Sequence, residues 1–261
     1  MMNRKHIVLP FVFVAMMTVA LYAQETESTS AKRLTAKDII KQSDDLMRGE
    51  TLHGNYTMKV ITPRWERELN LDVWTHGRTK TFIRILSPAK EAGIGTLRVD
   101  TNMWNYLPDV EKTIKIPPSM MFQPWMGSDF TNDDLVKESS IVEDYTHRIL
   151  GTIEMSGDEI YKIELLPKPE AAVTWGKLLF YIRTEDLLPV REKFYDEDGA
   201  LIKVLNYSKI EQMSDRKIPT HWEMESKIDD GHRTIIEVLR AEYNQPHSDG
   251  IYTMGNLKQV Q

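Results

Sequence analysis

The feature that most constrains this chain is an alternation of apolar and polar residues that recurs from about residue 56 onwards. Residues 56–61, 67–74 and 79–86 show it most clearly. Successive side chains of a β-strand point to opposite faces, so this alternation is typical of half-buried strands. Turn sequences end many of the segments, and no helix long enough for a parallel crossover separates them. The pattern predicts about 11 to 13 antiparallel strands, curled into a barrel or half-barrel.

One helix is predicted before the strands, over residues 36–48. Thr35 and Asp38 have the spacing of a capping box, in which each side chain accepts a hydrogen bond from the other residue's backbone N–H. Apolar residues then recur near helical spacing, and Gly49 follows as a C-cap candidate.

Residues 1–23 have the three-part layout of a secretory signal peptide. Two basic residues precede an almost entirely apolar run over positions 7–21, and Ala23 closes the segment. The run is shorter than the roughly 20 residues of a membrane-spanning helix. We therefore expect cleavage after Ala23, with a retained anchor as the alternative. Gln24 is not a cysteine, so no lipid anchor is expected, and polar residues 24–34 are predicted to be a flexible leader.

Composition excludes several functions for the remaining chain. The formal net charge is −6 for the whole chain and −8 once Arg4 and Lys5 leave with the signal, and this disfavours binding to nucleic acid. The chain has no cysteine, which excludes disulfides, thiolate catalysis and cysteine-based zinc sites. No composition break divides residues 35–261, so we expect one domain, which at this length can bury a sufficient core.

The histidines and carboxylates show no recognisable catalytic, metal or cofactor motif. His221 and Glu225 would share a helix face, but the alternation around them predicts a strand, where they lie too far apart to chelate. We therefore predict no catalytic residue, no metal and no cofactor.

An acidic cluster follows the middle of the chain. Thr131 precedes Asp133 and Asp134 in an arrangement typical of a helix N-terminus, and Asp129 lies just before it. Capping is the favoured role of these carboxylates. The alternative is a hydrolase that uses Asp129, Asp133 or His221.

Residues 117–138 do not alternate. They contain three prolines and three methionines, and methionine suits surfaces that accept variable apolar partners. The large apolar residues of this segment are Met120, Met121, Phe122, Trp125 and Met126. They either cover a ligand cavity or close one end of the core, and composition leaves both interpretations open.

Two long blocks and the C-terminal tail suggest a family. The blocks read NYLPDVEKTIKIPPSMMFQPWMGSDFTNDDL (105–135) and DEDGALIKVLNYSKIEQMSDRKIPTHWEMESKIDDGHRTIIEV (196–238), and the tail is IYTMGNLKQ (251–259). The sequence resembles LolA-like outer-membrane lipoprotein-sorting proteins, in which MGSDFT precedes a short acidic helix and IPT precedes a strand and GHRT. The chain departs from the better-known carriers in its length and in the MGSDFT segment.

The resemblance implies a mainly β fold of the LolA/LolB type: an incomplete antiparallel β-barrel of about eleven strands with short lid helices. It also implies a monomeric periplasmic carrier that takes acyl chains of lipoproteins or other lipids. Its partners would be an inner-membrane exporter of ABC or RND type and an outer-membrane acceptor. The alternative is an accessory protein that regulates an exporter through the apolar segment and carries nothing.

One face of each strand should line the cavity of such a fold. The residues expected there are Leu69, Leu71, Val73, Ile83, Ile85, Trp104 and Tyr106, with Met120, Met121, Phe122, Trp125 and Met126 as the lid. A register error of one residue would exchange the two faces.

Overall fold

The computed structural model describes residues 33–132, 134, 141–171 and 173–259. The chain divides into two units, residues 1–33 and 34–261, and the structure described below is that of the second unit. The predicted signal peptide, most of the predicted leader and the predicted capping residue Asp133 lie outside the described residues. Within the described part of the chain, no helix combines the length and apolarity that crossing a bilayer would require.

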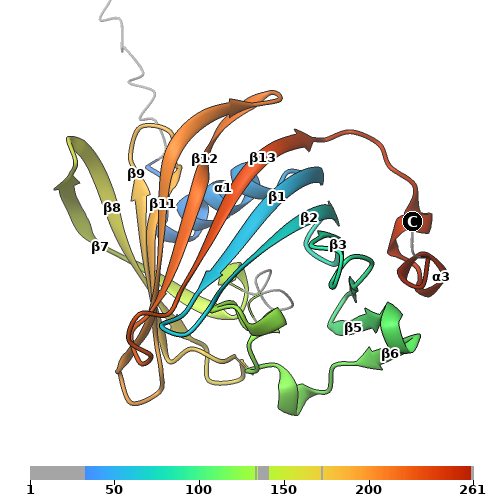
Figure 1. Ribbon diagram of the computed structural model, residues 1–261. Helices are drawn as coiled ribbons and strands as arrows, with labels where there is room; N and C mark the ends of the chain where they lie inside the picture. Colours follow the sequence, from blue (N-terminus) through green and yellow to red (C-terminus); the bar gives the residue numbers. More distant parts are fainter. Residues whose placement is uncertain (1–32, 133, 135–140, 172, 260–261) are drawn as a thin grey trace, which may run out of the picture. The chain divides into compact units, whose positions relative to one another are not determined.

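The described residues form one antiparallel sheet of 13 strands (Figure 1). In chain order the strands are β1 (Thr51–Ile61), β2 (Glu66–His76), β3 (Lys80–Ser87), β4 (Gly95–Val99), β5 (Asn102–Leu107), β6 (Lys112–Lys115), β7 (Tyr145–Met155), β8 (Asp158–Pro167), β9 (Lys177–Arg183), β10 (Pro189–Tyr195), β11 (Leu201–Met213), β12 (Arg216–Ser226) and β13 (Arg233–Tyr243). The predicted antiparallel, mainly β fold is confirmed, with two more strands than the resemblance implied.

The two edge strands of the sheet, β6 and β7, come from the middle of the chain. Strands run β6-β5-β4-β3-β2-β1-β13-β12-β11-β10-β9-β8-β7 across the sheet, so β1 pairs with β13 at the centre. In the described residues β6 and β7 do not pair with each other, and the sheet is therefore open. The segment between them must cross from one edge to the other. We call its described residues 117–132 and 134 the insert; it contains the short 3₁₀ turns η2 (Pro118–Met120) and η3 (Trp125–Gly127).

The predicted first helix is confirmed as α1 (Ala36–Arg48). The Asp38 backbone N–H donates to the Thr35 hydroxyl at 3.1 Å, and the Thr35 N–H donates to the Asp38 carboxylate at 3.0 Å. Gly49 ends the helix with a φ of 65°, a conformation that glycine adopts without strain. Ile39 and Ile40 are buried and pack the helix against one face of the sheet, which we call the inner face.

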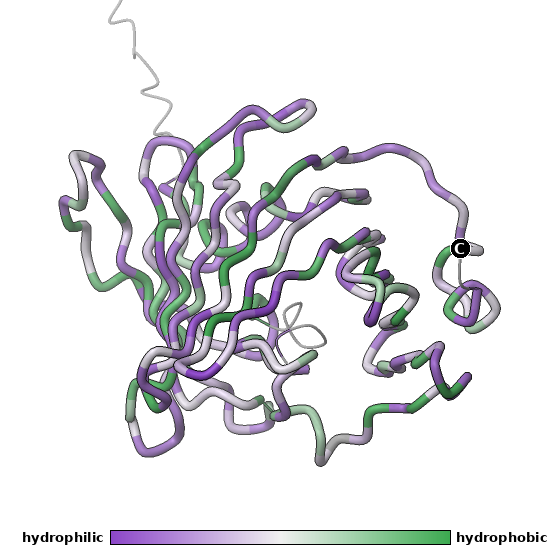
Figure 2. Tube along the Cα trace, viewed as in Figure 1, coloured by the Kyte–Doolittle hydropathy of each residue, from purple (hydrophilic) through white to green (hydrophobic). Residues whose placement is uncertain are grey.

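Alternation along the strands produces the inner face. In β1 the buried positions are Leu52, Tyr56, Met58 and Val60. Figure 2 shows the same alternation of hydrophobic and hydrophilic residues along the strands. The buried side chains form two clusters on this face, which share contacts with Trp222 and with Phe130 of the insert. This apolar face is the main core of the described unit.

The opposite, outer face carries a second, smaller core. The C-terminal segment contains η5 (Asp249–Tyr252) and α3 (Met254–Leu257) and packs on β3 to β5, where Tyr252 and Leu257 contact Phe82 and Leu97. The Arg84 guanidinium donates to main-chain carbonyls of this segment at 2.9 and 3.1 Å. Strands β3 to β5 are therefore buried on both faces.

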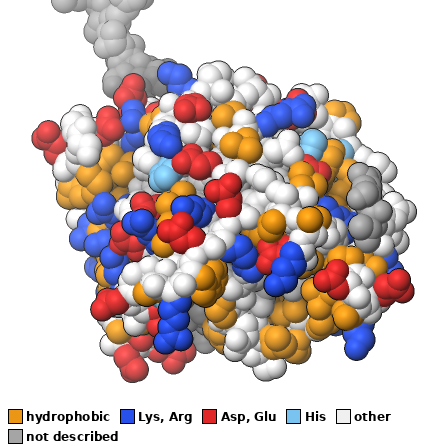
Figure 3. Space-filling model, viewed as in Figure 1, with side chains coloured by type: hydrophobic (Ala, Val, Ile, Leu, Met, Phe, Trp, Pro, Cys, Tyr) orange, Lys and Arg blue, Asp and Glu red, His pale blue; other side chains and the backbone are white. Residues whose placement is uncertain are grey.

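The surface mixes charges of both signs, as Figure 3 shows for one face. Many of these charges are paired, for example Arg148 with Glu164 at 2.6 Å and Lys80 with Asp249 at 2.7 Å. Exposed pairs of this kind contribute little to stability. The stability of the sheet must therefore come mainly from its covered faces.

Candidate functional site

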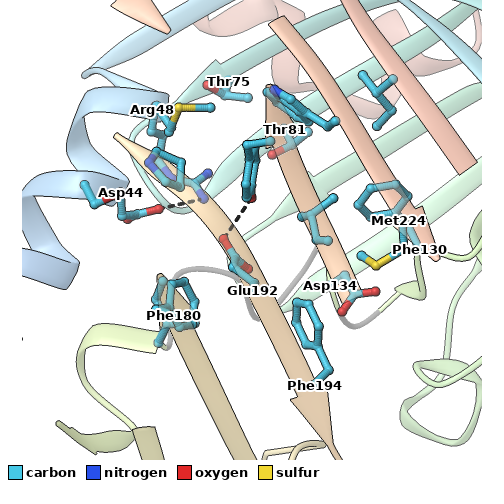
Figure 4. Close-up of a pocket in the computed structure, with 18 of the residues that line it drawn as sticks. Asp44, Arg48, Thr75, Thr81, Phe130, Asp134, Phe180, Glu192, Phe194 and Met224 are labelled. Carbon is cyan, nitrogen blue, oxygen red and sulfur yellow. Dashed lines mark hydrogen bonds and ion pairs between the residues drawn. The ribbon is translucent and has the colours of Figure 1, made fainter. Parts of the chain in front are cut away.

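A cavity of about 270 Å³ lies on the inner face, between the sheet, α1 and the insert (Figure 4). Its lining is mostly aliphatic and aromatic, and it comes from both halves of the sheet. The lining includes Met58, Leu71, Val73 and Ile83 from β1 to β3, Phe180, Phe194, Trp222 and Met224 from β9 to β12, and Trp125 and Phe130 from the insert. The volume is near the lower end of the roughly 300–1,000 Å³ found for small-molecule sites.

The expected residues of β2 and β3 lie on the inner face. Leu71, Val73 and Ile83 line the cavity, and Leu69 and Ile85 are buried beside it in the same cluster. In both strands the side chains expected to point inward do point inward. Whether these side chains contact a ligand stays a prediction.

The structure places Trp104 and Tyr106 elsewhere, and this corrects the expectation for β5. Both pack on the outer face with Phe82 and Leu97, whereas Met103 points inward and is fully buried. The alternation in β5 is real, but the C-terminal segment covers the outer face, so apolar residues are needed on both sides of the strand. Aromatic character therefore did not identify the inner face.

Some of the insert's large apolar side chains face the cavity or the core, and others face solvent. Trp125 is 2% exposed, lines the cavity, and its indole N–H donates to the Thr96 hydroxyl at 3.1 Å. Met121 is buried and Met126 packs against the same inner cluster. Met120 and Phe122 are 41% and 59% exposed and do not line the cavity, which corrects their expected place in the lid. Both residues lie in tight turns, closed by hydrogen bonds from the Met120 N–H to the Pro117 carbonyl at 2.9 Å and from the Gln123 N–H to the Met120 carbonyl at 3.1 Å.

Polar contacts attach the insert to the sheet. The Thr234 hydroxyl donates to the Asp129 carboxylate at 2.6 Å and accepts from the Asp129 backbone N–H at 2.9 Å. Burial raises the pKa of Asp129, and the Thr234 hydrogen bond opposes this rise. The Arg67 guanidinium donates to the Met126 carbonyl. Because Asp129 belongs to MGSDFT and Thr234 to GHRT, the two family-like motifs meet in space.

Lys203 of β11 also binds the insert. Its side chain is only 5% exposed, and its ammonium group pairs with the Asp134 carboxylate and donates to the Asp129 carbonyl at 3.3 Å. The ammonium group also lies 4.9 Å from the Trp175 ring centre and 5.1 Å from that of Phe194, within cation–π range. We call Asp129, Asp134, Lys203 and Thr234 the anchor cluster.

The capping role expected for Asp133 and Asp134 is observed for Asp134, the one of the two that the structure describes. The Thr131 N–H donates to the Asp134 carboxylate at 2.7 Å, and the Asp134 N–H donates to the Thr131 hydroxyl at 3.2 Å. This is the reciprocal arrangement of a capping box.

The residues of the hydrolase alternative do not converge. His221 of β12 lies beside the inward-facing Trp222 and therefore points to the outer face, where its Nδ1 is 2.6 Å from the Glu237 carboxylate. Asp129 lies on the inner side, bound to Thr234. Within the described ranges, no group of three or more histidines and carboxylates is arranged to hold a metal ion.

The cavity also has a polar end that the sequence analysis missed. Thr75 and Thr81 are paired neighbours on β2 and β3, and both line the cavity near α1. Asp44 and Arg48 of α1 line the same end, 3.5 Å apart. Extending the inward phase of Leu71 and Val73 by two residues would have identified Thr75, and extending that of Ile83 and Ile85 would have identified Thr81. Nothing local to α1 indicated Asp44 and Arg48.

The Glu192 carboxylate contributes a further polar group to this end of the lining. It accepts a hydrogen bond from the Tyr207 hydroxyl at 2.8 Å, across the β10–β11 pair. Glu192 lies two residues before Phe194 on β10, and both line the cavity, so alternation along the strand places the two side chains on the inner face.

Comparisons with known proteins agree on the fold. A family model described only as "-like: Uncharacterized protein" matches residues 77–259. A DUF1329 family protein from Desulfovibrio piger is 21% identical, with a TM-score of 0.79 over 85% of this chain and 97% of its own. An outer membrane lipoprotein-sorting protein domain from Vibrio parahaemolyticus is 19% identical, with a TM-score of 0.75 over 86% and 98%.

A LolA superfamily protein from Nitrosomonas europaea is 21% identical, with a TM-score of 0.73 over 85% of this chain and 99% of its own. No curated protein matches the sequence. At these identities the structural likenesses establish a shared fold and leave function to be argued from the site.

Proposed function

Because the chain belongs to the uncharacterized family matched over residues 77–259 and has the LolA-like fold, we propose that it is a non-catalytic carrier of acyl chains. The observation that carries this proposal is the apolar cavity of about 270 Å³ on the inner face. Burial of each methylene in such a cavity contributes roughly 0.8 kcal/mol. A bound chain therefore needs no reactive group to be held.

The proposed cellular role rests on the predicted signal peptide and on the resemblance to LolA-like proteins. A cleaved signal over residues 1–23 would place the mature chain in the periplasm. There it would receive lipoprotein acyl chains or other lipid from an inner-membrane exporter of ABC or RND type and pass them towards an outer-membrane acceptor. The similar structure from Vibrio parahaemolyticus, described as an outer membrane lipoprotein-sorting protein domain, supports a role in lipoprotein sorting.

Native mass spectrometry of protein purified from membranes tests the proposal, together with uptake of a fluorescent acyl probe. We expect co-purified lipid or lipopeptide and saturable uptake. Val73→Phe should fill part of the cavity and reduce uptake severalfold, because Val73 lines it. Leu86→Phe is the matched control, since Leu86 is an exposed residue of the neighbouring strand that does not line the cavity. Absence of both co-purified lipid and probe uptake would overturn the carrier proposal.

A second candidate, an accessory module that binds an exporter and carries nothing, is favoured by the outward-facing part of the insert. Phe122 lines a separate hollow of about 900 Å³ with Trp65 and Ile228, and all three are exposed. For this function, Phe122→Ser should abolish export-linked activity in cells, whereas Val73→Phe should leave it unchanged. The carrier predicts the opposite order of effects.

A further inference from the structure

The cavity is polar at one end and apolar at the other. Figure 4 shows Asp44, Arg48 and Thr75 together beside α1, with Phe194 and Met224 at the far side. Asp134 also reaches the far side, but its carboxylate is paired with Lys203. A ligand that fills the cavity would therefore meet the polar side chains Asp44, Arg48 and Thr75 at its α1 end.

Thr75 is the most informative of these groups. It is 7% exposed, and among the described residues its hydroxyl has no hydrogen-bond partner. The side chain of Thr81, its partner in the β2–β3 register, lines the cavity as well. A buried hydroxyl without a partner is costly, so polar ligand atoms at this position would stabilise the site.

The charges at this end are balanced. The Arg48 guanidinium lies 3.5 Å from Asp44, and the Arg78 guanidinium pairs with both Asp44 and Asp45. Glu192 adds a further carboxylate to the lining. The described groups therefore offer no excess positive charge, and an anionic ligand head would face nearby carboxylates. A neutral or zwitterionic head fits this environment better.

The volume limits the tail. At about 270 Å³ the cavity is near the lower limit for small-molecule sites, and it is bounded by the buried Trp125 and by Phe130 at the insert. This space suits one slender chain. A diacyl or triacyl lipid would require displacement of the insert, which the anchor cluster opposes.

We infer that the preferred ligand is a single-chain amphiphile with a neutral or zwitterionic, hydrogen-bonding head, as in monoacylglycerols and lysophospholipids. The head lies beside Thr75 and Thr81 at the α1 end, and the chain extends towards Phe194 and the insert. This inference rests on the proposed acyl-binding function and adds the ligand class and its orientation.

Calorimetric titration of the mature chain with four defined compounds tests the ligand class. Monopalmitoylglycerol and palmitoyl-lysophosphatidylcholine should bind, and palmitate and dipalmitoylglycerol should bind at least tenfold more weakly. Equal or tighter binding of dipalmitoylglycerol or palmitate would overturn the inference and leave the carrier proposal standing. Absence of binding by all four compounds would overturn both.

Threonine-to-valine variants test the orientation. Thr75→Val combined with Thr81→Val should weaken monopalmitoylglycerol binding about tenfold, the effect of losing two neutral hydrogen bonds, and should leave binding of the headless chain 1-hexadecene unchanged. Thr113→Val is the matched control, because the Thr113 hydroxyl is also buried without a partner among the described residues but does not line the cavity. If the double variant binds monopalmitoylglycerol as tightly as the unaltered chain, the assigned head position is wrong.

Discussion

Helix α1 and the insert cover the same inner face by different means. The helix satisfies most of its own backbone hydrogen bonds. Burial of Ile39 and Ile40 holds it on the sheet, with ion pairs from Arg78 to Asp44 and Asp45 at one edge. The described residues of the insert have short 3₁₀ turns and one isolated β-bridge between Pro124 and Thr131, and side chains bind further carbonyls of its backbone. The Arg67 guanidinium donates to the Met126 carbonyl, and the Asn132 amide donates to the Met120 carbonyl at 3.0 Å.

This difference explains why the recognisable motifs lie in and around the insert. A cover without regular structure must be fixed by specific polar partners, and these have to appear at defined positions of the chain. Asp129 of MGSDFT and Thr234 of GHRT are such partners. A helical cover needs an apolar stripe and two caps, which many sequences provide. We therefore expect the insert to depend on single side chains more strongly than α1 does.

The largest effect should come from Trp125→Ala. Removal of this buried indole leaves a cavity beside the existing one and the Thr96 hydroxyl without its donor, so unfolding free energy should fall by about 3–5 kcal/mol. Urea denaturation measures this. Trp65→Ala is the control, because Trp65 is 45% exposed, and it should change stability by less than about 0.5 kcal/mol. Equal effects of the two substitutions would show that the insert is not an integral cover.

Lys203→Met should have the next largest effect. The change preserves volume but leaves the Asp134 carboxylate without its cation in a nearly buried place, at a cost of about 3 kcal/mol. Adding Asp134→Asn should restore most of this loss. A double-mutant cycle from urea denaturation measures the coupling. Additive effects would mean that the pair does not hold the insert.

On the helical side, Thr35→Ala should cost about 1 kcal/mol, because it removes one half of the capping box and leaves the apolar face of α1 intact. Thermal unfolding provides the measurement. If Thr35→Ala lowered the unfolding free energy as much as Lys203→Met does, α1 would depend on single side chains as strongly as the insert.

The smallest effect concerns pH. Burial raises the pKa of Asp129 above its usual value of 3.8, so the folded state binds this proton more tightly than the unfolded state. Its contribution to stability is therefore full below the ordinary aspartate pKa and is lost as pH rises through the folded value. Asp129→Asn keeps an acceptor for Thr234 and should be slightly more stable than the unaltered chain at neutral pH.

That advantage should disappear below about pH 4, where Asp129 of the unaltered chain is protonated. Denaturation midpoints at a series of pH values would show it. An advantage that grows on acidification would contradict the raised pKa.

Much of the fold was predictable from local pattern. Alternation predicted the strands and the inward phase of Leu71, Val73 and Ile83, and the capping box predicted the start of α1. The resemblance to LolA-like proteins is confirmed at the level of the fold. Both successes rest on short-range physics: strand periodicity and helix capping involve residues within a few positions of one another.

The sequence by itself determined which segments are strands, where the first helix begins and ends, and that an irregular apolar segment interrupts the alternation. Only the tertiary structure decided which face of β5 points inward, because the C-terminal segment buries Trp104 and Tyr106 from the outside. It also decided that Thr75, Thr81 and Glu192 meet around one cavity. These outcomes depend on contacts between residues far apart in the chain, and periodicity within one strand carries no information about what covers its two faces.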